Sequence, residues 1–480
     1  MARKHSTKKR RSGISRRTFF GAAAGSAALP FLRPMPAIAE NRFRSSMLRD
    51  YVGRLCFNEN PLGPSPEAMT AIHDQVSMGH RYSDWYAESL RGDLAELHGV
   101  SSSEVIAGCG ATEILRLCAH AFADPAGNVV CPYPSYGQFA GDSNFLGASV
   151  RYAALDEDYR VDLATVAAEV DNDTTAVCIT NANNPTGPVL PAADIAAFVD
   201  SLPSHVTVLI DEAYHEYIHD PGYESAMELA RLGKNVVVIR TFSKVFGLAG
   251  IRIGYAVGKT ELITSMRSWQ LYATVNCLGL AGSRAALTDS QHVTDTVDLC
   301  DQTKAYCFTE LDAMGVEYIP SETNFFMAHV GDGSHVASEL AARGILVRCG
   351  WGMPEHIRVS TGTMQEMQDF ITALAEILGT AGAGEVLIPK TTALDGNYPN
   401  PARGKTRISY SIARPGPVLL QVFDIHGRLI KTIVNESKSP GRYALSWNGT
   451  DQRGAPVAAG SYFYRLKAGD TVQTRRLILL

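Results

Sequence analysis

The sequence predicts an α/β fold followed by a separate all-β domain, and three observations support this. Continuous apolar runs at 176–180, 206–210 and 236–239, typical of buried parallel strands, each end in polar residues. A fourth run, 105–107, leads through a glycine-containing turn into a helical pattern that starts at Glu113. Beyond Leu378 the helical pattern gives way to short alternating runs separated by turns. The 480 residues are enough for two to three domains.

Lys244 is the residue with the most specific chemical setting. It follows the strand at 236–239 and lies beside Thr241 and Ser243, with Arg252 close behind. A lysine just beyond a buried strand can lose its proton and condense with an aldehyde, while hydroxyls and a guanidinium hold a phosphate. The sequence therefore predicts a pyridoxal 5'-phosphate site with Lys244 as the catalytic amine.

The ends of the other strands supply the remaining groups that this cofactor needs. In open α/β sheets ligands bind at the carboxyl ends of the strands, so distant residues converge there. A carboxylate at Asp211 keeps a pyridine nitrogen protonated through a charge-assisted hydrogen bond. Asn184 and Tyr214 are suitable donors to the phenolate oxygen of the ring.

The segment after the strand at 105–107 provides a place for the phosphate. Gly110, Ala111 and Thr112 stand at the start of the predicted helix, where free backbone amides bind a phosphate dianion. Thr241, Ser243 and Arg252 assist them. Tyr136 follows the apolar pair at 129–130 and is placed to stack on the cofactor ring.

Residues from about 48 to 378 resemble the fold-type-I aminotransferases of class I and II, and most of all the histidinol-phosphate aminotransferases. The matching stretches are 58–66, 81–82, 110–113, 183–187, 211–214, 241–244, 248–254 and 357–363. The resemblance implies a large domain at about 83–289 with a mostly parallel seven-stranded sheet. It also implies a small α+β domain made of about 40–82 and 290–380, so that the catalytic region spans 40–380.

The resemblance also assigns roles to single residues. Lys244 is implied to be the Schiff-base partner of the cofactor and the proton shuttle at the substrate α-carbon. Tyr82 is implied to reach the phosphate in a neighbouring subunit, so the active unit is expected to be a homodimer. Arg358 is implied to hold the anionic end of the substrate with help from Arg348, and Asn60 belongs to the same substrate side.

The substrate and the reaction remain open among several alternatives. The favoured reaction is transamination of a small amino donor, either histidinol phosphate or an aromatic or broad-range amino acid, with 2-oxoglutarate as acceptor. Ala182, Ser83 and the pair Gln138-Phe139 depart from the family pattern on the substrate side. A decarboxylase or lyase would use the same cofactor residues. The remote alternative is a zinc peptidase, because His215 to His219 satisfy a His-Glu-x-x-His pattern, but Asp220-Pro221-Gly222 leaves no room for the helix that this motif requires; in the favoured reading no metal is expected.

The first 39 residues resemble a twin-arginine signal peptide. Arg16-Arg17 precede an alanine-rich apolar stretch that is too short to span a bilayer, and an A-x-A site ends at Ala39. We therefore expect export by that machinery to the periplasm, the cell surface or the exterior, with no stable membrane span. Removing residues 1–39 leaves 35 basic and 49 acidic residues, a net charge of −14, which argues against nucleic acid as a partner. The nine cysteines show no disulfide framework spacing, which suits folding under reducing conditions.

The end of the chain is predicted to be a linker at 381–400 and a β-sandwich at 401–480. Short runs recur at 407–412, 418–423, 429–434, 443–447, 461–466 and 472–480. Stretches 422–428, 447–451 and 459–464 resemble the Ig-like modules related to the flagellar hook-capping protein and to type IX sorting domains. This resemblance implies a role in sorting or surface attachment.

Overall fold

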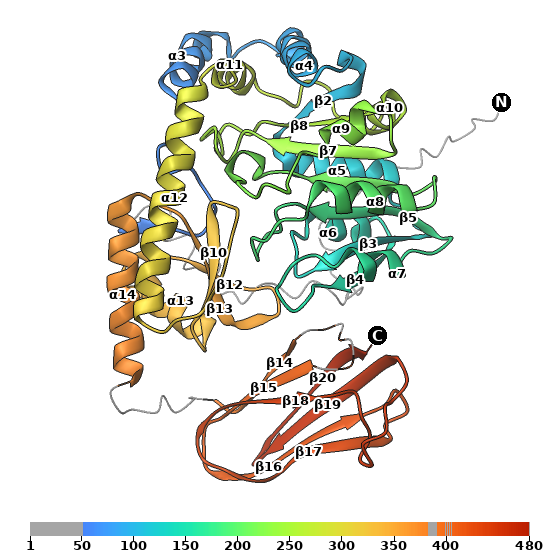
Figure 1. Cartoon of the computed structure of the whole chain (residues 1–480), viewed down its shortest axis with the longest axis vertical. Helices are drawn as coiled ribbons and strands as arrows, with labels where there is room; N and C mark the ends of the chain where they lie inside the picture. The colour runs from blue at the N-terminus through green and yellow to red at the C-terminus, as the bar shows by residue number, and fades with distance from the viewer. Residues whose placement is uncertain are drawn as a thin grey trace, which may run out of the picture. The chain divides into compact units, whose positions relative to one another are not determined.

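The computed structural model describes residues 51–382, 391–398, 400, 402, 404 and 406–479 (Figure 1). The expected signal peptide at 1–39 lies outside the described residues. Among the helices in these ranges, none combines the length and the apolar character needed to cross a bilayer.

A seven-stranded sheet forms the centre of the catalytic region, with the strand order β2-β8-β7-β6-β5-β3-β4. Its strands are β2 (Val105–Gly108), β3 (Asn128–Tyr133), β4 (Ser149–Ala154), β5 (Thr174–Thr180), β6 (Thr207–Asp211), β7 (Val236–Thr241) and β8 (Gly254–Gly258). Neighbouring strands from β4 to β7 pair in parallel, whereas β8 runs antiparallel to both of its neighbours. The predicted mostly parallel seven-stranded sheet is confirmed.

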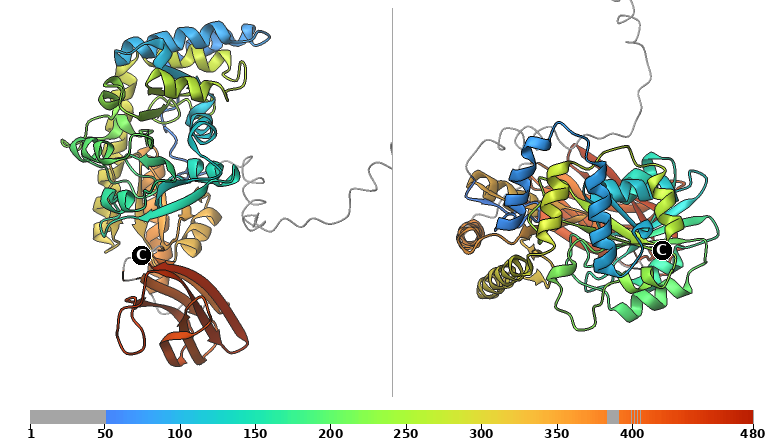
Figure 2. Two further views of the ribbon diagram at one scale, coloured as in Figure 1. Left: turned by 90° about the vertical axis from the view of Figure 1, so that its right-hand side faces the viewer. Right: turned by 90° about the horizontal axis from the view of Figure 1, so that it is seen from above.

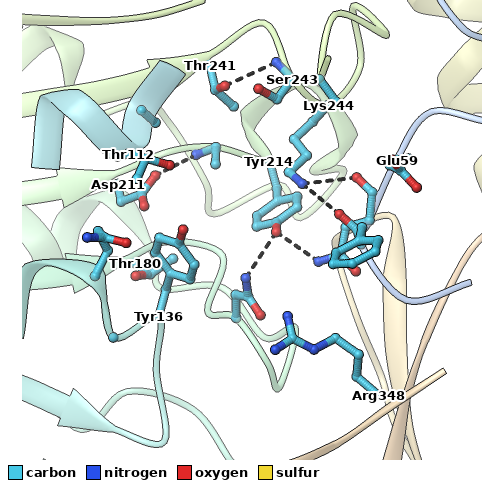
Figure 3. A pocket seen from close by; sticks show the side chains of 18 of the residues that line it. Glu59, Thr112, Tyr136, Thr180, Asp211, Tyr214, Thr241, Ser243, Lys244 and Arg348 are labelled. Carbon is cyan, nitrogen blue, oxygen red and sulfur yellow. Dashed lines mark hydrogen bonds between the residues drawn. The ribbon is translucent and has the colours of Figure 1, made fainter. Parts of the chain in front are cut away.

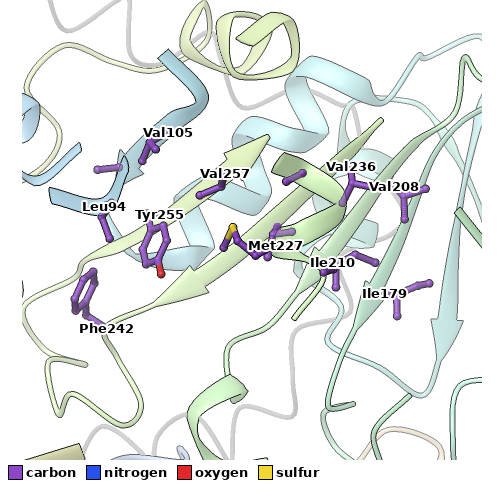
Figure 4. Packing of buried hydrophobic residues seen from close by; sticks show 14 of the residues in the cluster. Leu94, Val105, Ile179, Val208, Ile210, Met227, Val236, Phe242, Tyr255 and Val257 are labelled. Atoms are coloured by element: carbon purple, nitrogen blue, oxygen red, sulfur yellow. The ribbon is translucent and has the colours of Figure 1, made fainter. Parts of the chain in front are cut away.

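Apolar side chains on both faces of this sheet are buried, which explains why its strands appear in the sequence as continuous apolar runs. In β7, Val236 and Val238 enter the core on one face, while Val237 and Ile239 enter the core on the other. Figure 4 shows the first of these cores, where strand residues pack with Leu94 and Met227. The helices that cover this face include α4 (Asp84–His98), α7 (Leu163–Ala168), α8 (Ala192–Ser201) and α9 (Met227–Arg231), and those of the opposite face are α5 (Gly110–Phe122), α6 (Gln138–Phe145) and α10 (Thr260–Arg267).

A second, smaller unit joins the start of the described chain to the end of the catalytic region. Its four-stranded sheet has the order β12-β13-β10-β9, and β1 (Gly53–Arg54) pairs in parallel with β11 (Ile345–Leu346). The other elements are β9 (Tyr318–Ile319), β10 (Phe325–His329), β12 (Arg348–Gly350), β13 (Met353–Ser360), α12 (Ser290–Ala313), α13 (Gly333–Ala342) and α14 (Met364–Gly382). This composition agrees with the α+β character expected for the small domain.

The first boundary predicted for the small domain is wrong for helix α3 (Pro66–Gln75). This helix packs beside α11 (Cys277–Ala286), as Figures 1 and 2 show. Ala68 and Ile72 of α3 belong to the core of the large sheet rather than to the core of the small unit. The close approach depends on Gly282 of α11, because a Cβ atom there would lie 2.7 Å from Ile72. Short 3-10 turns lie at η1 (Val76–Met78), η2 (Ser102–Glu104) and η3 (His215–Tyr217).

The C-terminal region is an antiparallel sandwich of two sheets, β14-β15-β18 and β17-β16-β19-β20. Its strands are β14 (Ala393–Tyr398), β15 (Thr406–Ile412), β16 (Gly416–Phe423), β17 (Leu429–Lys438), β18 (Gly441–Trp447), β19 (Gly460–Ala468) and β20 (Thr471–Leu479). Buried Trp447, Tyr410 and Tyr464 dominate its core. The predicted linker at 381–400 is therefore too long, because β14 pairs with β15 and completes the first sheet.

Candidate active site

A cavity of about 760 Å³ opens where strands of the large sheet end (Figure 3). Thr180 ends β5, Asp211 ends β6 and Thr241 ends β7, and all three line the cavity. Thr180 and Asp211 are direct partners in the parallel register, which places their side chains at the same edge. The predicted site residues that line this cavity are Ala111, Thr112, Tyr136, Asn184, Asp211, Tyr214, Thr241, Ser243, Lys244, Arg252, Arg348 and Arg358.

Lys244 follows β7, and its amine lies against the N-terminal segment of the described chain. Its Nζ atom donates hydrogen bonds of 3.0 and 3.1 Å to the backbone oxygens of Phe57 and Asn58 (Figure 3). Burial, followed by the positive charge of Arg358, lowers the pKa of Lys244 to about 8. A lysine with that pKa holds an appreciable fraction of free amine near neutral pH, which a nucleophile or a proton acceptor requires.

Asp211 is a buried carboxylate at the floor of the cavity. One of its oxygens accepts a hydrogen bond of 3.1 Å from the backbone nitrogen of Ala213. Burial raises the pKa of Asp211 to about 7, and the nearby Lys244 opposes that rise. A protonated ring nitrogen placed beside this carboxylate would provide the missing positive charge.

The hydroxyl of Tyr214 is the centre of a buried hydrogen-bond network. It accepts hydrogen bonds from the Nδ2 atoms of Asn58 at 2.9 Å and Asn184 at 3.1 Å. Burial raises the pKa of Tyr214 to about 12, and the charge of Arg358 acts in the opposite direction. Asn58 is itself fixed by Ser360, whose hydroxyl donates to its Oδ1 and accepts from its backbone nitrogen, both at 2.8 Å. Two amides and a phenol are thus held as polar groups at one wall of the cavity.

The N-terminus of α5 and the loop after β7 form a second, anion-compatible corner. Ala111 and Thr112 from the helix start line the cavity together with Ser243 and Arg252. Gly110 does not line it but makes the approach of Arg252 feasible, because a Cβ atom at Gly110 would lie 2.4 Å from a guanidinium nitrogen of Arg252. Gly110 also has a φ of +79°, which favours glycine.

Arg348 and Arg358 form a cationic wall on the side of the small unit. The guanidinium carbons of Arg348 and Arg358 lie 5.3 and 4.9 Å from the ring centre of Trp351. Arg358 donates to Asn184 Oδ1 at 2.6 Å and to the backbone oxygen of Cys56 at 2.9 Å, while its buried Nε atom has no protein partner. Burial lowers the pKa of Arg358 to about 10. Two neighbouring guanidinium groups, one of them with a donor that has no protein partner, suit an anionic ligand.

Three predicted residues, Asn60, Tyr82 and Gly110, do not line the cavity. Tyr82 is expected to serve a neighbouring subunit, so only the setting of Asn60 needs correction. Asn60 Nδ2 donates to the backbone oxygen of Val245 at 2.7 Å and to Thr296 Oγ1 at 3.0 Å, so its side chain supports the loop after Lys244 instead of facing a substrate. Tyr82 is 80% exposed and packs edge-on against Tyr272. The third, Gly110, acts through Arg252 as described above.

Several cavity residues were missed by the sequence reasoning. Trp351 carries the stacking surface for both arginines, and its place three residues after Arg348 was the available signal. Other additions are two polar pairs at the cavity wall, Arg54 with Glu59 at 3.2 Å and Gln138 with Asp142 at 2.7 Å. Phe57 and Asn58 also line the cavity. Asn58 and Glu59 belong to the family-like stretch at 58–66, and Gln138 belongs to the pair that departs from the family pattern.

The His-Glu-x-x-His segment does not have the geometry of a zinc peptidase. Residues His215–Tyr217 form a single 3-10 turn rather than an α-helix. His215 Nδ1 pairs with the hydroxyl of Tyr223 at 2.9 Å, whereas His219 Nε2 pairs with Asp301 at 2.8 Å. Among the residues that the structure describes, no group of three or more His, Cys, Asp or Glu side chains is arranged to hold a metal ion.

Comparison with known proteins gives the same picture for both parts of the chain. Residues 52–374 match the family model of aminotransferase class I and II, and residues 400–471 match that of the FlgD Ig-like domain. A histidinol-phosphate aminotransferase of Akkermansia muciniphila is 36% identical over 327 residues, which cover 68% of this chain and 90% of the relative. That of Symbiobacterium thermophilum is 36% identical over 335 residues, 69% of this chain and 92% of the relative.

A solved structure supports the comparison. The histidinol-phosphate aminotransferase from Sinorhizobium meliloti, in complex with pyridoxal-5'-phosphate, superposes with a TM-score of 0.66 and 26% sequence identity. The superposition covers 74% of this chain and 96% of that chain. The likeness therefore spans nearly the whole of the solved enzyme.

Proposed function

Because this chain belongs to the class I and II aminotransferase family, we propose that it transfers the amino group of a small donor with an anionic end to 2-oxoglutarate. The protein is a pyridoxal 5'-phosphate-dependent aminotransferase. The observation that carries the proposal is that Lys244, Asp211 and the pair Arg348 and Arg358 line one cavity. An amine, a buried carboxylate and an anion-binding wall are the groups that this reaction requires.

The cavity residues fit the cofactor. When bound, pyridoxal 5'-phosphate draws electrons from the bonds at the α-carbon of the donor. Asp211 suits its ring nitrogen, because a buried carboxylate lacking a charged hydrogen-bond partner is stabilised by a protonated nitrogen. The space that Gly110 leaves for Arg252, together with Ala111, Thr112, Thr241 and Ser243, suits the phosphate.

The remaining residues are proposed to act on the ring and the substrate. Tyr136 lines the cavity near Asp211 and offers a ring for stacking. Asn184 and Tyr214 orient the phenolate side through their amide and hydroxyl groups. Lys244 takes a proton from the donor α-carbon and later returns one, since its lowered pKa allows both forms near neutral pH.

The substrate class follows from the two arginines. Guanidinium groups bind carboxylate and phosphate in the same forked geometry, so the anionic end of the donor is a carboxylate or a phosphate. The relatives named histidinol-phosphate aminotransferase favour histidinol phosphate as the first donor to test. An aromatic or broad-range amino acid is the second.

The test is a set of half-reactions on protein loaded with pyridoxal 5'-phosphate. Histidinol phosphate and then each common amino acid are added without acceptor, while the visible absorbance of the cofactor and the donor products are followed. Conversion to the pyridoxamine form with a 2-oxo product supports the proposal and identifies the donor. Release of carbon dioxide, or of a lyase product, without the pyridoxamine form would contradict it.

We also propose a homodimer in which Tyr82 serves the neighbouring cavity. Its exposed ring and the exposed Leu271 and Tyr272 near it support this arrangement. Mixing a Tyr82→Phe subunit with a Lys244→Ala subunit tests it, because each mixed dimer then keeps one cavity free of both substitutions. A monomer in light scattering, or no recovery of activity on mixing, would be contrary to the proposal.

The ends of the chain support a proposal about location. The signal-like residues 1–39 would direct the folded, cofactor-loaded enzyme out of the cytoplasm, and the FlgD-like domain would sort or attach it. Fractionation of cells that express the full chain, an Arg16→Lys/Arg17→Lys variant and a chain ending at residue 392 tests both steps. Retention of the double variant in the cytoplasm is expected. A truncated chain found in the same compartment as the full chain would disprove the role of the C-terminal domain.

A further inference from the structure

The C-terminal sandwich carries a charge opposite to that of the catalytic region. Residues 400–480 contain 13 Lys and Arg against 4 Asp and Glu, a net charge of +9. Residues 51–380 contain 18 against 41, a net charge of −23. A field of that strength attracts anions to the sandwich and repels them from the rest of the chain. On net charge, an extended anionic surface is therefore favoured by the sandwich over the outer surface of the catalytic region.

Part of this positive charge is gathered on the outer face of one sheet. In β19, Tyr462, Tyr464 and Leu466 enter the core, so Phe463, Arg465 and Lys467 point away from it. The register places Arg476 of β20 and Phe423 of β16 on either side of Phe463. We call Arg465, Lys467, Arg476, Phe423 and Phe463 the outer face. The guanidinium of Arg465 lies 4.5 Å from the ring centre of Phe423.

The acidic residues of the domain leave these cations free. Asp424 pairs with Arg428, and Glu436 pairs with Lys438 at 2.6 Å. Asp451 accepts hydrogen bonds from the backbone of its own turn, and Asp470 lies in the turn between β19 and β20. Within the described part of the chain, no ion pair involves Arg465, Lys467 or Arg476. Their charge is available to an external anion.

An apolar tip lies at one end of the outer face. The turn between β16 and β17 exposes Ile425 by 63% and is followed by Leu429, which is 52% exposed. Leu429 lies opposite Phe423, which in turn lies opposite Phe463. The turn is held in shape by Asp424, which accepts hydrogen bonds of 2.9 Å from the backbone nitrogens of His426 and Arg428. Exposed apolar side chains beside unpaired cations suit a membrane interface, where binding combines apolar burial with attraction to anionic lipids.

We propose that the outer face binds the phosphate groups of an anionic lipid surface, with Ile425 and Leu429 entering the head-group region. Each cation near such a surface contributes about 1 kcal/mol, and the apolar tip adds burial that a soluble polyanion does not offer. The tip is the reason to favour a lipid surface over nucleic acid, whose phosphate backbone would leave Ile425 and Leu429 in water. The lipid phosphate can belong to a phospholipid or to lipid A.

Vesicle sedimentation of the compact unit Tyr51–Leu480 tests this proposal. This unit lacks the twelve Lys and Arg residues of positions 1–50 and carries 32 basic and 47 acidic residues, a net charge of −15. We expect it to bind vesicles of phosphatidylcholine with one third phosphatidylglycerol, but not phosphatidylcholine alone. Arg465→Ser/Arg476→Ser should weaken binding about thirtyfold, about fivefold for each cation. Vesicles with lipid A in place of phosphatidylglycerol distinguish the two sources of phosphate.

The matched control is Arg116→Ser/Arg414→Ser, which removes two exposed cations that do not belong to the outer face as defined above. It should bind vesicles like the unchanged unit, and both double variants should keep full aminotransferase activity as evidence of folding. Equal weakening by both double variants would show only a net-charge effect and would overturn the proposal. Failure of the unit to bind any of the vesicles would also overturn the proposal, even if a polyanionic resin retains the unit.

Discussion

The Oδ1 atom of Asn184 accepts a hydrogen bond of 2.6 Å from Nη1 of Arg358, while the Nδ2 atom of the same amide donates to Tyr214 at 3.1 Å. One short side chain thus connects the wall proposed for the cofactor to the wall proposed for the substrate anion. Because both ends of the Asn184 amide are hydrogen-bonded, the amide cannot rotate without breaking a bond, and the two walls keep a fixed relative position. A substitution on one wall should therefore change the position of side chains on the other.

Lys244→Ala should reduce transamination about 10⁴-fold, because the proton transfer at the α-carbon loses its acid and base. The rate is measured with the best donor and 2-oxoglutarate. The spectrum should also lose the band that depends on the lysine. Lys259→Ala is the control and should keep wild-type activity, since Lys259 does not line the cavity. A Lys244→Ala protein with substantial activity would contradict the assignment.

Arg358→Gln should shift the pH dependence of cofactor loading. The pKa of Lys244 is lowered to about 8 by burial and then by Arg358, so removing that cation should raise it. Because only the free amine reacts with the aldehyde, the loading rate rises with pH, with a midpoint near 8 in the wild type and a higher midpoint in the variant. Arg348→Gln, in the same cavity, should leave the midpoint in place. The rate is followed by absorbance after mixing with pyridoxal 5'-phosphate, and an unchanged midpoint in Arg358→Gln would exclude this coupling.

Asp211→Asn should change how the stability of the cofactor-free protein depends on pH. Burial raises the pKa of Asp211 from 3.8 to about 7, so the folded state holds this proton more tightly than the unfolded chain. That stabilisation is complete below the unfolded pKa and is lost as the pH rises through 7. Relative to wild type, the variant should gain roughly 3 kcal/mol in free energy of unfolding between pH 5 and pH 8.

Urea denaturation of both cofactor-free proteins at the two pH values measures this difference. Exposed Asp194→Asn is the control and should parallel the wild type. A difference between Asp211→Asn and wild type that stays constant with pH would show that the carboxylate is not perturbed. The same variant should also lose transamination activity, because a neutral amide no longer keeps the ring nitrogen protonated.

Gly247→Ala should destabilise the protein by about 2 to 5 kcal/mol. A Cβ atom there would lie 2.0 Å from the backbone oxygen of Gly63, and the φ of +68° adds strain. Gly233 has a φ of +70° with open space around it, so Gly233→Ala should cost only about 1 to 2 kcal/mol. Equal unfolding free energies for the two variants in urea would rule out the steric contact as the cause.

Trp351→Ala should raise the KM of the donor about 2- to 30-fold with a smaller effect on kcat. The indole supports both Arg348 and Arg358, and such contacts contribute about 0.5 to 2 kcal/mol. Trp269→Ala, outside the cavity, is the control. Steady-state kinetics at saturating 2-oxoglutarate measure the effect, and an unchanged KM would mean that the stacking does not order the arginines.

The sequence was most informative where strands end. Asp211 and Lys244 follow apolar runs that only a buried strand explains, and their meeting follows from the shared carboxyl edge of parallel strands. Strand patterns could not place Asn60, because the partners of its Nδ2 atom are Val245 and Thr296, 185 and 236 positions away. A motif reveals that a polar residue matters but not whether it faces a ligand or the protein.

Two further differences have the same physical origin. The family resemblance implies that helix α3 belongs to the small domain, yet the space left by Gly282 lets Ile72 join the other core. The expected linker at 381–400 rests on a glycine-rich stretch and on Asn397-Tyr398-Pro399-Asn400-Pro401, and this range includes strand β14. Its pairing with β15 contains a register shift between Leu394 and Gly396, and local composition does not show a bulge of that kind.

The bonds between Asn58 and Ser360 join residues that lie 302 positions apart. A ribosome adding about 5 to 20 residues per second needs roughly 15 to 60 s to travel between them. Until Ser360 is made, Asn58 lacks the hydroxyl that fixes its amide, and until Arg358 is made the cofactor has no complete cavity to enter. Loading is therefore confined to chains whose catalytic region is nearly finished, and any early release from synthesis yields a protein that cannot retain its cofactor.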